Sequence, residues 1–142
     1  MYDEPLMSSI STIALSGMNA AARRLEVSAS NVANAMSTGA LPNADGTVPV
    51  GAPRAYAPIV LVQTASAGGG TQTTVKTATP STTAVYDPQA PFANQDGLVA
   101  APDVDLSQEM IGQLIASYSF AANATVMKAD DRMTKALLNI TA

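Results

Sequence analysis

Apolar residues recur at steps of three and four along the last third of the chain. The positions that keep this spacing are Ile111, Ile115, Tyr118, Ala122, Val126, Ala129, Met133, Ala136 and Ile140. Such spacing places side chains on one face of an α-helix, and polar and charged residues occupy the other side. The pattern predicts one amphipathic helix from Asp105 to Ile140, roughly 50 Å long at about 1.5 Å per residue.

The same spacing occurs near the other end of the chain. Its members are Ile10, Ala14, Met18, Ala21, Leu25, Ser28 or Ala29, Val32 and Met36. The pattern predicts a second helix from about Ser9 to Met36, with a stripe of aliphatic residues, Met and Ala that suits packing against the first. The two terminal helices are therefore expected to pair.

The segment before this helix, residues 1–8, is expected to be a loose arm. Pro5 would block an earlier helix start. A serine would then supply the N-cap acceptor, either Ser8, Ser9 or Ser11. Two native starts stay open, Met1 and Met7.

The residues between the helices have a different composition. Gly, Pro, Asn and Asp from Gly39 to Pro53 indicate a loop, in which Asn43, Asp45 and Gly46 predict a plain turn because most ligands of a calcium loop are missing. Short β-prone runs follow at 59–62, 71–77, 82–86 and 98–99, and the Gly68–Gly70 break lets the first two form a hairpin. Asp103 or Asp105 is expected to cap the last helix.

These patterns together predict a mainly α fold. Long N- and C-terminal helices pair as a coiled coil, and a small β-rich or irregular insert lies between them in the chain. The expected divisions are 1–38 for the N-terminal helix, 39–102 for the insert and extended connector, and 103–142 for the C-terminal helix.

Composition limits how much core such a fold can bury. Hydrophobic residues make up 47% of the 142 residues, but many are Ala, and there are two Phe, four Tyr and no Trp. Large side chains supply most of the buried area per residue, so the core is expected to be thin. Two helices with narrow stripes cannot cover each other on all sides, which predicts assembly with other copies or partners.

The residue types for most enzyme chemistry are missing. The chain has no His and no Cys, which removes the commonest general base, a common metal ligand and the thiol nucleophile. No glycine-rich phosphate loop follows the required pattern. We therefore expect no enzyme activity, catalytic residue, cofactor, metal or small-molecule substrate.

The distribution of charge and apolar residues argues against nucleic-acid binding, a secretory signal and a membrane span. The net charge is −4 and the basic residues are scattered, so no nucleic-acid partner is expected. The first residues contain Asp3, Glu4 and Pro5 where a secretory signal has basic residues, so no signal peptide is expected. The uncharged stretch between Arg54 and Lys76 is interrupted by polar residues and glycines and does not predict a membrane span.

Asparagine is a poor helix former, so Asn31 and Asn34 near the end of the first helix need a physical reason. One explanation is helix capping and solvation. The other is hydrogen bonding to a neighbouring helix, which would fix the register of packing. The same two alternatives hold for Asn123.

The first predicted helix resembles a known signature. The runs Ala14 to Ala21 and Arg24 to Asn34 resemble the N-terminal signature of bacterial flagellar axial proteins, which centres on an Asn-x-Ala-Asn element. The matching residues are Asn31, Ala33 and Asn34. This signature identifies the superfamily of rod, hook and hook-associated proteins.

The second half resembles one member family, the flagellar basal-body rod protein C family of the proximal rod. The resemblance rests on Val85 to Pro88, Pro91 to Ala93, Asp96 to Val99, Pro102 to Asp105, Glu109-Met110 and Ala116 to Asn123. The sequence departs from the family pattern at four positions, where the family usually has Asn, Arg, Tyr and Gln. They are Asp103, Tyr118, Phe120 and Ala121.

The resemblance implies a structural subunit of the proximal rod that polymerises through its terminal helices, transmits torque and supports motility. It implies export through the flagellar type III apparatus without a cleaved signal peptide, and a place in the basal body's periplasm-spanning rod. The implied partners are other copies, other rod proteins, the export apparatus and motor ring components. Alternatives are another axial protein, such as rod protein B or a junction component, and a secreted helical binding module.

Within this interpretation the two helices supply the residues for helix packing and subunit interfaces. These residues are Ile10, Ala14, Met18, Leu25, Asn31, Val32, Asn34, Ile111, Ile115, Tyr118, Ala122, Asn123, Val126, Met133 and Ile140.

Overall fold

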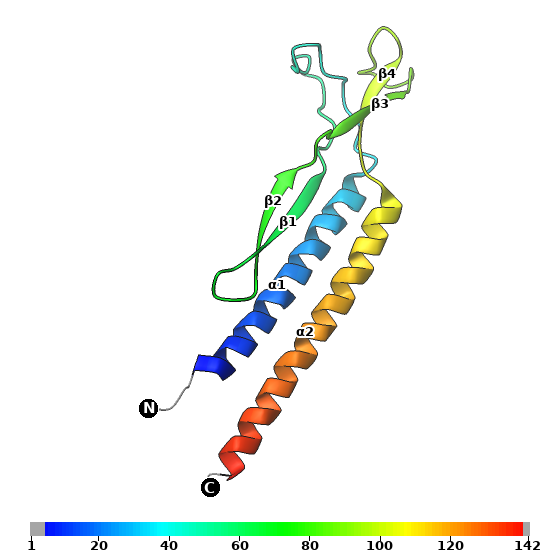
Figure 1. Cartoon of the computed structure of the whole chain (residues 1–142). Coiled ribbons are helices and arrows are strands. Elements are labelled where there is room, and N and C mark those ends of the chain that lie inside the picture. The colour runs from blue at the N-terminus through cyan, green and yellow to red at the C-terminus, as the bar shows by residue number, and fades with distance from the viewer. Residues whose placement is uncertain (1–4, 141–142) are drawn as a thin grey trace. The chain divides into compact units, whose positions relative to one another are not determined.

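The computed structural model of the chain describes residues 5–140 and contains two long helices and four strands (Figure 1). In chain order the elements are α1 (Pro5–Asn34), β1 (Ile59–Ala65), β2 (Thr71–Thr77), β3 (Thr82–Tyr86), β4 (Leu98–Pro102) and α2 (Leu106–Ile140). The helices hold 30 and 35 residues and the strands five or seven each. The prediction of two terminal helices with a small β-containing insert is confirmed.

Helix α1 begins earlier than expected. It starts at Pro5, so the prediction that Pro5 blocks the helix and that a serine near position 9 caps it is wrong. Proline suits the first helical position because the N–H it lacks would have no intrahelical partner and its φ is already helical. Residues 1–4 lie outside the described residues, and the choice between Met1 and Met7 as the start stays open.

The C-terminal end of α1 also differs slightly from the prediction. The helix ends at Asn34, and the chain leaves it through a turn in which the Ser37 N–H donates to the Asn34 carbonyl at 2.9 Å. Met36, expected to be the last helical residue, is exposed. The Met36 side chain is therefore not part of the buried side of α1.

Asp105 caps helix α2, as one of the two alternatives predicted. Its Oδ1 accepts hydrogen bonds from the backbone N–H groups of Ser107 at 2.9 Å and Gln108 at 3.1 Å. Asp103 instead uses its backbone N–H, which donates to the Ser81 carbonyl at 3.1 Å. The cap supplies partners to two N–H groups that the helix itself cannot satisfy.

Replacing this cap tests its contribution to α2. Asp105→Ala is expected to lower the stability of the helix by about 1 kcal/mol, because two N–H groups lose their acceptor. Far-ultraviolet circular dichroism of the purified chain should then show less helix and a lower unfolding midpoint. Asp103→Ala is the matched control; an equal loss in both variants would contradict the assignment of the cap.

The strands form two separate two-stranded sheets. β1 pairs with β2, and β3 pairs antiparallel with β4 in a register that runs from Thr82 opposite Pro102 to Tyr86 opposite Leu98. The predicted strands at 71–77 and 82–86 are confirmed, and the short strand expected at 98–99 continues to Pro102.

The chain contacts divide into two compact units. Among the described residues, unit 1 contains 5–26, 61–74 and 111–140, and unit 2 contains 27–60 and 75–110. Each unit thus takes part of both helices. The divisions expected at residues 38 and 102 follow the order of elements along the chain and stay predictions.

In unit 1 the segments of α1 and α2 run antiparallel, with the β1–β2 hairpin beside α1 (Figure 1). Ser11 bonds to Asp130, whereas Gly17, further along α1, lies against Asn123, which comes earlier in α2. The tip of the hairpin is fixed to α1 where the Thr71 N–H donates to Ser16 Oγ at 3.1 Å.

Unit 2 has a small core of Val and Ala. Val27, Ala40, Val99 and Ala100 are buried, and Val99 is the largest fully buried side chain among the described residues. Gly39 and Ala100 exchange two backbone hydrogen bonds of 2.9 Å each. The thin core expected from composition is confirmed, because mostly small side chains fill it.

Candidate assembly surface

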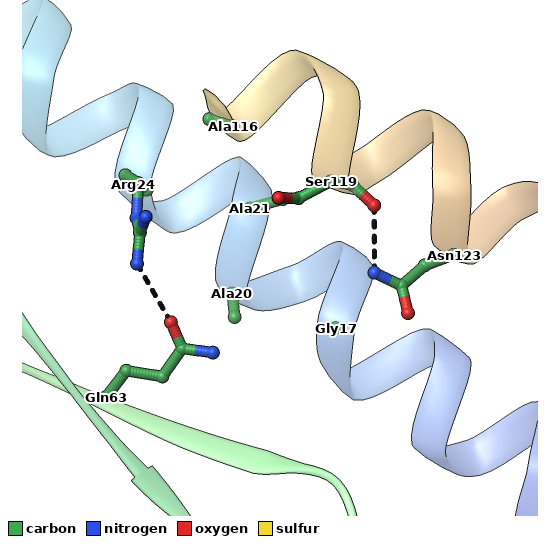
Figure 2. Close-up of a pocket in the computed structure, with 8 residues that line it drawn as sticks. All are labelled: Gly17, Ala20, Ala21, Arg24, Gln63, Ala116, Ser119 and Asn123. Atoms are coloured by element: carbon green, nitrogen blue, oxygen red, sulfur yellow. Dashed lines mark hydrogen bonds between the residues drawn. The ribbon is translucent and has the colours of Figure 1, made fainter. Parts of the chain in front are cut away.

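The contact between α1 and α2 in unit 1 is made by small residues. Ala14 is 1% exposed and Ala116 is 2% exposed. A Cβ added at Gly17 would lie 2.5 Å from Asn123 Oδ1, so a larger residue fits there only if the Asn123 side chain moves (Figure 2). Small side chains let helices approach closely but bury little apolar area per residue.

A carboxylate is buried in the same contact. Asp130 is 4% exposed; its Oδ2 accepts a hydrogen bond from Ser11 Oγ, and its Oδ1 has no hydrogen-bond partner. A buried polar oxygen without a partner lowers stability because its desolvation is not offset. The helix contact within one chain therefore contains a destabilising group as well as few large apolar side chains.

The apolar residues predicted for packing on α2 are not the ones that the structure buries, which are Ala116 and Asp130. Ile111, Ile115, Tyr118, Ala122, Val126, Met133 and Ile140 are all exposed, Tyr118 at 76%. We call these seven residues the α2 apolar stripe. Their predicted role in helix packing or subunit interfaces is not tested by a single chain and stays a prediction.

The residues that do face α1 follow members of the predicted pattern by one position. Ala116 follows Ile115, Asn123 follows Ala122, and Asp130 follows Ala129. One residue is about 100° around a helix, so the buried side of α2 is displaced by roughly that angle from the α2 apolar stripe. A single chain therefore leaves the larger apolar residues of α2 exposed.

The predicted residues of α1 are divided between buried and exposed positions. Ala14 is buried, and Ile10 and Met18 are half-buried, while Leu25 and Val32 are exposed. The interface role predicted for the exposed ones is not tested within a single chain and stays a prediction.

In unit 2, Asn31 uses its whole hydrogen-bonding capacity. It is 2% exposed; its Nδ2 donates to the Ile59 carbonyl at 2.8 Å and to Glu109 Oε1 at 2.6 Å. Its Oδ1 accepts from the Ile59 N–H at 3.0 Å and from the Tyr56 hydroxyl at 3.1 Å. An amide has two donor hydrogens and two acceptor sites, so this side chain is fully satisfied. The second explanation for Asn31, bonding to neighbouring elements, is confirmed.

The other two asparagines bond within their own helices. Asn34 Nδ2 donates to the Ser30 carbonyl at 2.9 Å, and Asn123 Nδ2 donates to the Ser119 carbonyl at 2.8 Å (Figure 2). Asn123 also contacts α1, through its close approach to Gly17. The three asparagines therefore act separately, and only Asn31 joins three elements.

Two of the structurally important residues were not predicted. Asp130 was not recognised, although it continues the spacing of Ala116 and Asn123 in steps of seven. Glu109 Oε1 binds Asn31 and its backbone carbonyl accepts from Ser28 Oγ at 3.0 Å. A line of Ala, Ser, Asn and Asp along one helix side was the available signal, because those short side chains permit close packing.

The positions that depart from the family pattern lie on the surface. Asp103, Tyr118, Phe120 and Ala121 are all exposed. Their substitution therefore alters what the chain presents to other molecules rather than its own core.

Residues 43–47 form the plain turn that the sequence predicts. Thr47 donates to Asp45 Oδ1 through its hydroxyl at 2.6 Å and its N–H at 2.9 Å. These bonds hold the pKa of the Asp45 carboxyl below its usual value, the hydroxyl bond being the larger cause.

Residues 5–140 contain no group of three or more acidic, His or Cys side chains placed to hold a metal ion. Neither helix in that range combines the length and apolar character of a membrane span.

Comparison with family models gives two matches. Residues 12–40 match the model described as flagella basal body rod protein, and residues 95–140 match the model described as flagellar basal body rod FlgEFG protein C-terminal. The two matches cover most of α1 and all of α2. They include the asparagine signature and the approach to the last helix.

Individual proteins match over a longer range. The chain is 34% identical over 120 residues to the flagellar basal-body rod protein FlgC of Escherichia coli O6:H1, which covers 81% of this chain and 83% of that protein. It is 35% identical over 120 residues to FlgC of Salmonella typhimurium, with the same coverage. A shorter match, 41% over 56 residues, links it to FlgC of Bacillus subtilis. The chain belongs to the FlgC family of flagellar basal-body rod proteins.

Proposed function

We propose that this chain is a structural subunit of the flagellar basal-body proximal rod, which polymerises through its terminal helices and transmits torque. The relatives carry the name of a basal-body rod protein. Support from the chain itself comes from the α2 apolar stripe, whose seven members are exposed in a single chain. Large exposed apolar surfaces favour association, and a polymer would cover this one.

The proposed assembly pairs α1 and α2 as a coiled coil with helices of neighbouring subunits. Within one chain α1 approaches α2 at Gly17, which lies against Asn123, and larger residues such as Ile115 and Val126 stay exposed for a neighbour. Each contact would be shallow. Stiffness under torque would arise because many subunits repeat the same contact.

The proposal extends to localisation and partners. The chain would leave the cytoplasm through the flagellar type III export apparatus without a cleaved signal peptide and become part of the periplasm-spanning rod. Its partners would be other copies, other rod proteins and motor ring components. A chain whose helix contact includes the unpartnered Asp130 oxygen would unfold readily for export. No catalytic activity is part of this proposal.

Charge substitution on the α2 apolar stripe tests the assembly role. Ala122→Asp and Ile115→Asp are expected to abolish motility while export continues, because a carboxylate would be desolvated between subunits without a partner. Motility in soft agar and the amount of exported chain are the measurements. Lys128→Asp changes an exposed residue off the stripe and should leave motility largely intact; normal swimming by both stripe variants would disprove this role.

Sedimentation and circular dichroism separate the alternative functions. A poorly helical monomer that gains helix on mixing with candidate axial proteins supports the rod subunit. A stable, highly helical monomer that binds none of them would support a secreted binding module instead. If the chain is recovered in basal bodies only at a junction, another axial role replaces the proximal rod.

A further inference from the structure

A cavity of about 140 Å³ lies in unit 1 where α1, β1 and α2 meet (Figure 2). Its apolar lining is small: Gly17, Ala20, Ala21 and Ala116. Its polar lining consists of Arg24, Gln63, Ser119 and Asn123. A side chain with a short apolar stem and a polar tip would fit such a space, because the stem would contact alanine methyl groups and the tip would reach hydrogen-bond donors.

Arg24 gives the cavity a positive charge that no carboxylate of the described residues neutralises. Its Nη2 donates to Gln63 Oε1 at 3.0 Å, so its partner is a neutral amide (Figure 2). The ion pairs in the described range join Arg23 to Glu26 and Lys135 to Asp131. A guanidinium has five N–H donors in a planar fork, and one bond to Gln63 leaves most of them free for an anion.

The same chain carries acidic side chains suited to that charge. Asp96 and Asp103 are exposed, and within residues 5–140 their carboxylates have no hydrogen-bond or ion-pair partner. Asp103 lies just before α2, where its backbone N–H is bonded to the Ser81 carbonyl. The chain therefore has an unpaired guanidinium in a cavity and unpaired carboxylates on its surface.

We propose that this cavity accepts an aspartate side chain from a second copy of the chain, with Arg24 binding its carboxylate. The candidates are Asp96 and Asp103 of the neighbouring copy. Bidentate guanidinium–carboxylate pairs fix geometry as well as contributing binding energy, so the contact would set the position of one subunit against the next. The inference rests on the proposed rod function and adds a polar positioning contact to the apolar one.

Two separate single substitutions, at Arg24 in the cavity and at its neighbour Arg23 outside it, test the site. Arg24→Gln is expected to reduce the amount of chain in purified basal bodies about tenfold, the effect of losing one charge-assisted hydrogen bond. Arg23→Gln removes the same charge from a side chain that does not line the cavity and should have little effect. Arg24→Lys keeps the charge and should give an intermediate amount. Equal recovery of Arg24→Gln and wild type would overturn the proposal.

Charge exchange identifies the occupant. Arg24→Asp is expected to block assembly through repulsion, and a second substitution, Asp103→Arg or Asp96→Arg, should restore part of it. Restoration by either one supports a second copy as the source of the carboxylate. If neither restores assembly, the occupant is not this chain and the proposal fails.

Disulfide trapping keeps this test independent of the rod assignment. The chain has no cysteine, so a disulfide between introduced residues has no background. A mixture of the purified Ser119→Cys chain with the Asp103→Cys or Asp96→Cys chain, oxidised with copper phenanthroline, should give linked dimers. Ser117→Cys, which does not line the cavity, should give few. Wild-type chain missing from basal bodies would refute the rod function alone; absence of dimers in the oxidised mixture of purified chains would refute the cavity contact alone.

Discussion

Asn31→Asp is expected to lower the free energy of unfolding of unit 2 by about 3–5 kcal/mol and to abolish motility. The substitution keeps the shape of the side chain and replaces the donating nitrogen with an oxygen. The bonds from Nδ2 to the Ile59 carbonyl and to Glu109 Oε1 are then lost. The new carboxylate would face Glu109, and breaking a buried polar network in this way leaves charge without a partner.

The size of this effect follows from the position of Asn31. Its amide holds the first residue of β1 through both the N–H and the carbonyl of Ile59, and it holds α2 through Glu109. Each of these bonds lies within unit 2. Because domain stability is usually about 5–15 kcal/mol, a loss of this size removes a large part of it.

Asn34→Asp is the matched control for this prediction. Asn34 is the other asparagine of the signature, but its amide bonds to the Ser30 carbonyl in its own helix and it is half-buried. A loss of about 1 kcal/mol or less is expected there. Urea unfolding of the purified chains and motility of cells carrying each variant are the measurements. Equal effects of the two substitutions would show that Asn31 has no special role in joining the elements.

Local chemistry made most of the elements predictable. The spacing of Ile111 to Ile140 predicted α2 nearly to the residue, and Asp105 was one of two predicted caps. The strands at 71–77 and 82–86 followed from β-branched residues bounded by Gly and Pro. These features depend on residues close in the sequence, which periodicity and capping rules describe.

The partner of each helix face could not be predicted in the same way. The apolar pattern on α2 predicted Ile115 and Tyr118 for helix packing or subunit interfaces, whereas Ala116 and Asn123 are the residues that lie toward α1 within one chain. In a globular monomer the most apolar side of a helix covers the core. When a chain is a subunit, its largest apolar residues can be reserved for neighbours, and a single sequence does not distinguish the two cases.

The sequence indicates a structural role for Asn31 but not for Asp130. Two asparagines near the end of a helix are unusual enough to require an explanation, so Asn31 was recognised with its alternatives open. Asp130 stands beside Asp131 in a stretch of charged residues, where a solvent-exposed position is the ordinary expectation. Only the antiparallel register, which brings Ser11 to Asp130, explains its burial.

Gly17→Leu is expected to separate the two helices of unit 1 and to abolish rod assembly. Even a Cβ at this position would lie 2.5–2.7 Å from three atoms of the Asn123 side chain, and Leu adds three more carbons. Gly17→Ala should be milder, because the Asn123 amide is the end of a side chain and can rotate away at the cost of its 2.8 Å bond to Ser119. For Gly17→Ala the free energy of unfolding is expected to fall by about 1–3 kcal/mol, the usual cost of overpacking.

Gly112→Ala provides the control, since both glycines lie within helices but a Cβ at Gly112 would have no heavy atom within 4 Å. There the substitution should stabilise α2 by up to about 1 kcal/mol, because Ala is the better helix former. Thermal unfolding and recovery of each variant in basal bodies are the measurements. Asn123→Ala, which removes the atoms that clash, should restore Gly17→Ala but not Gly17→Leu. If Gly17→Leu assembles normally, the close approach of α1 and α2 is not needed in the rod, and assembly depends on the α2 apolar stripe instead.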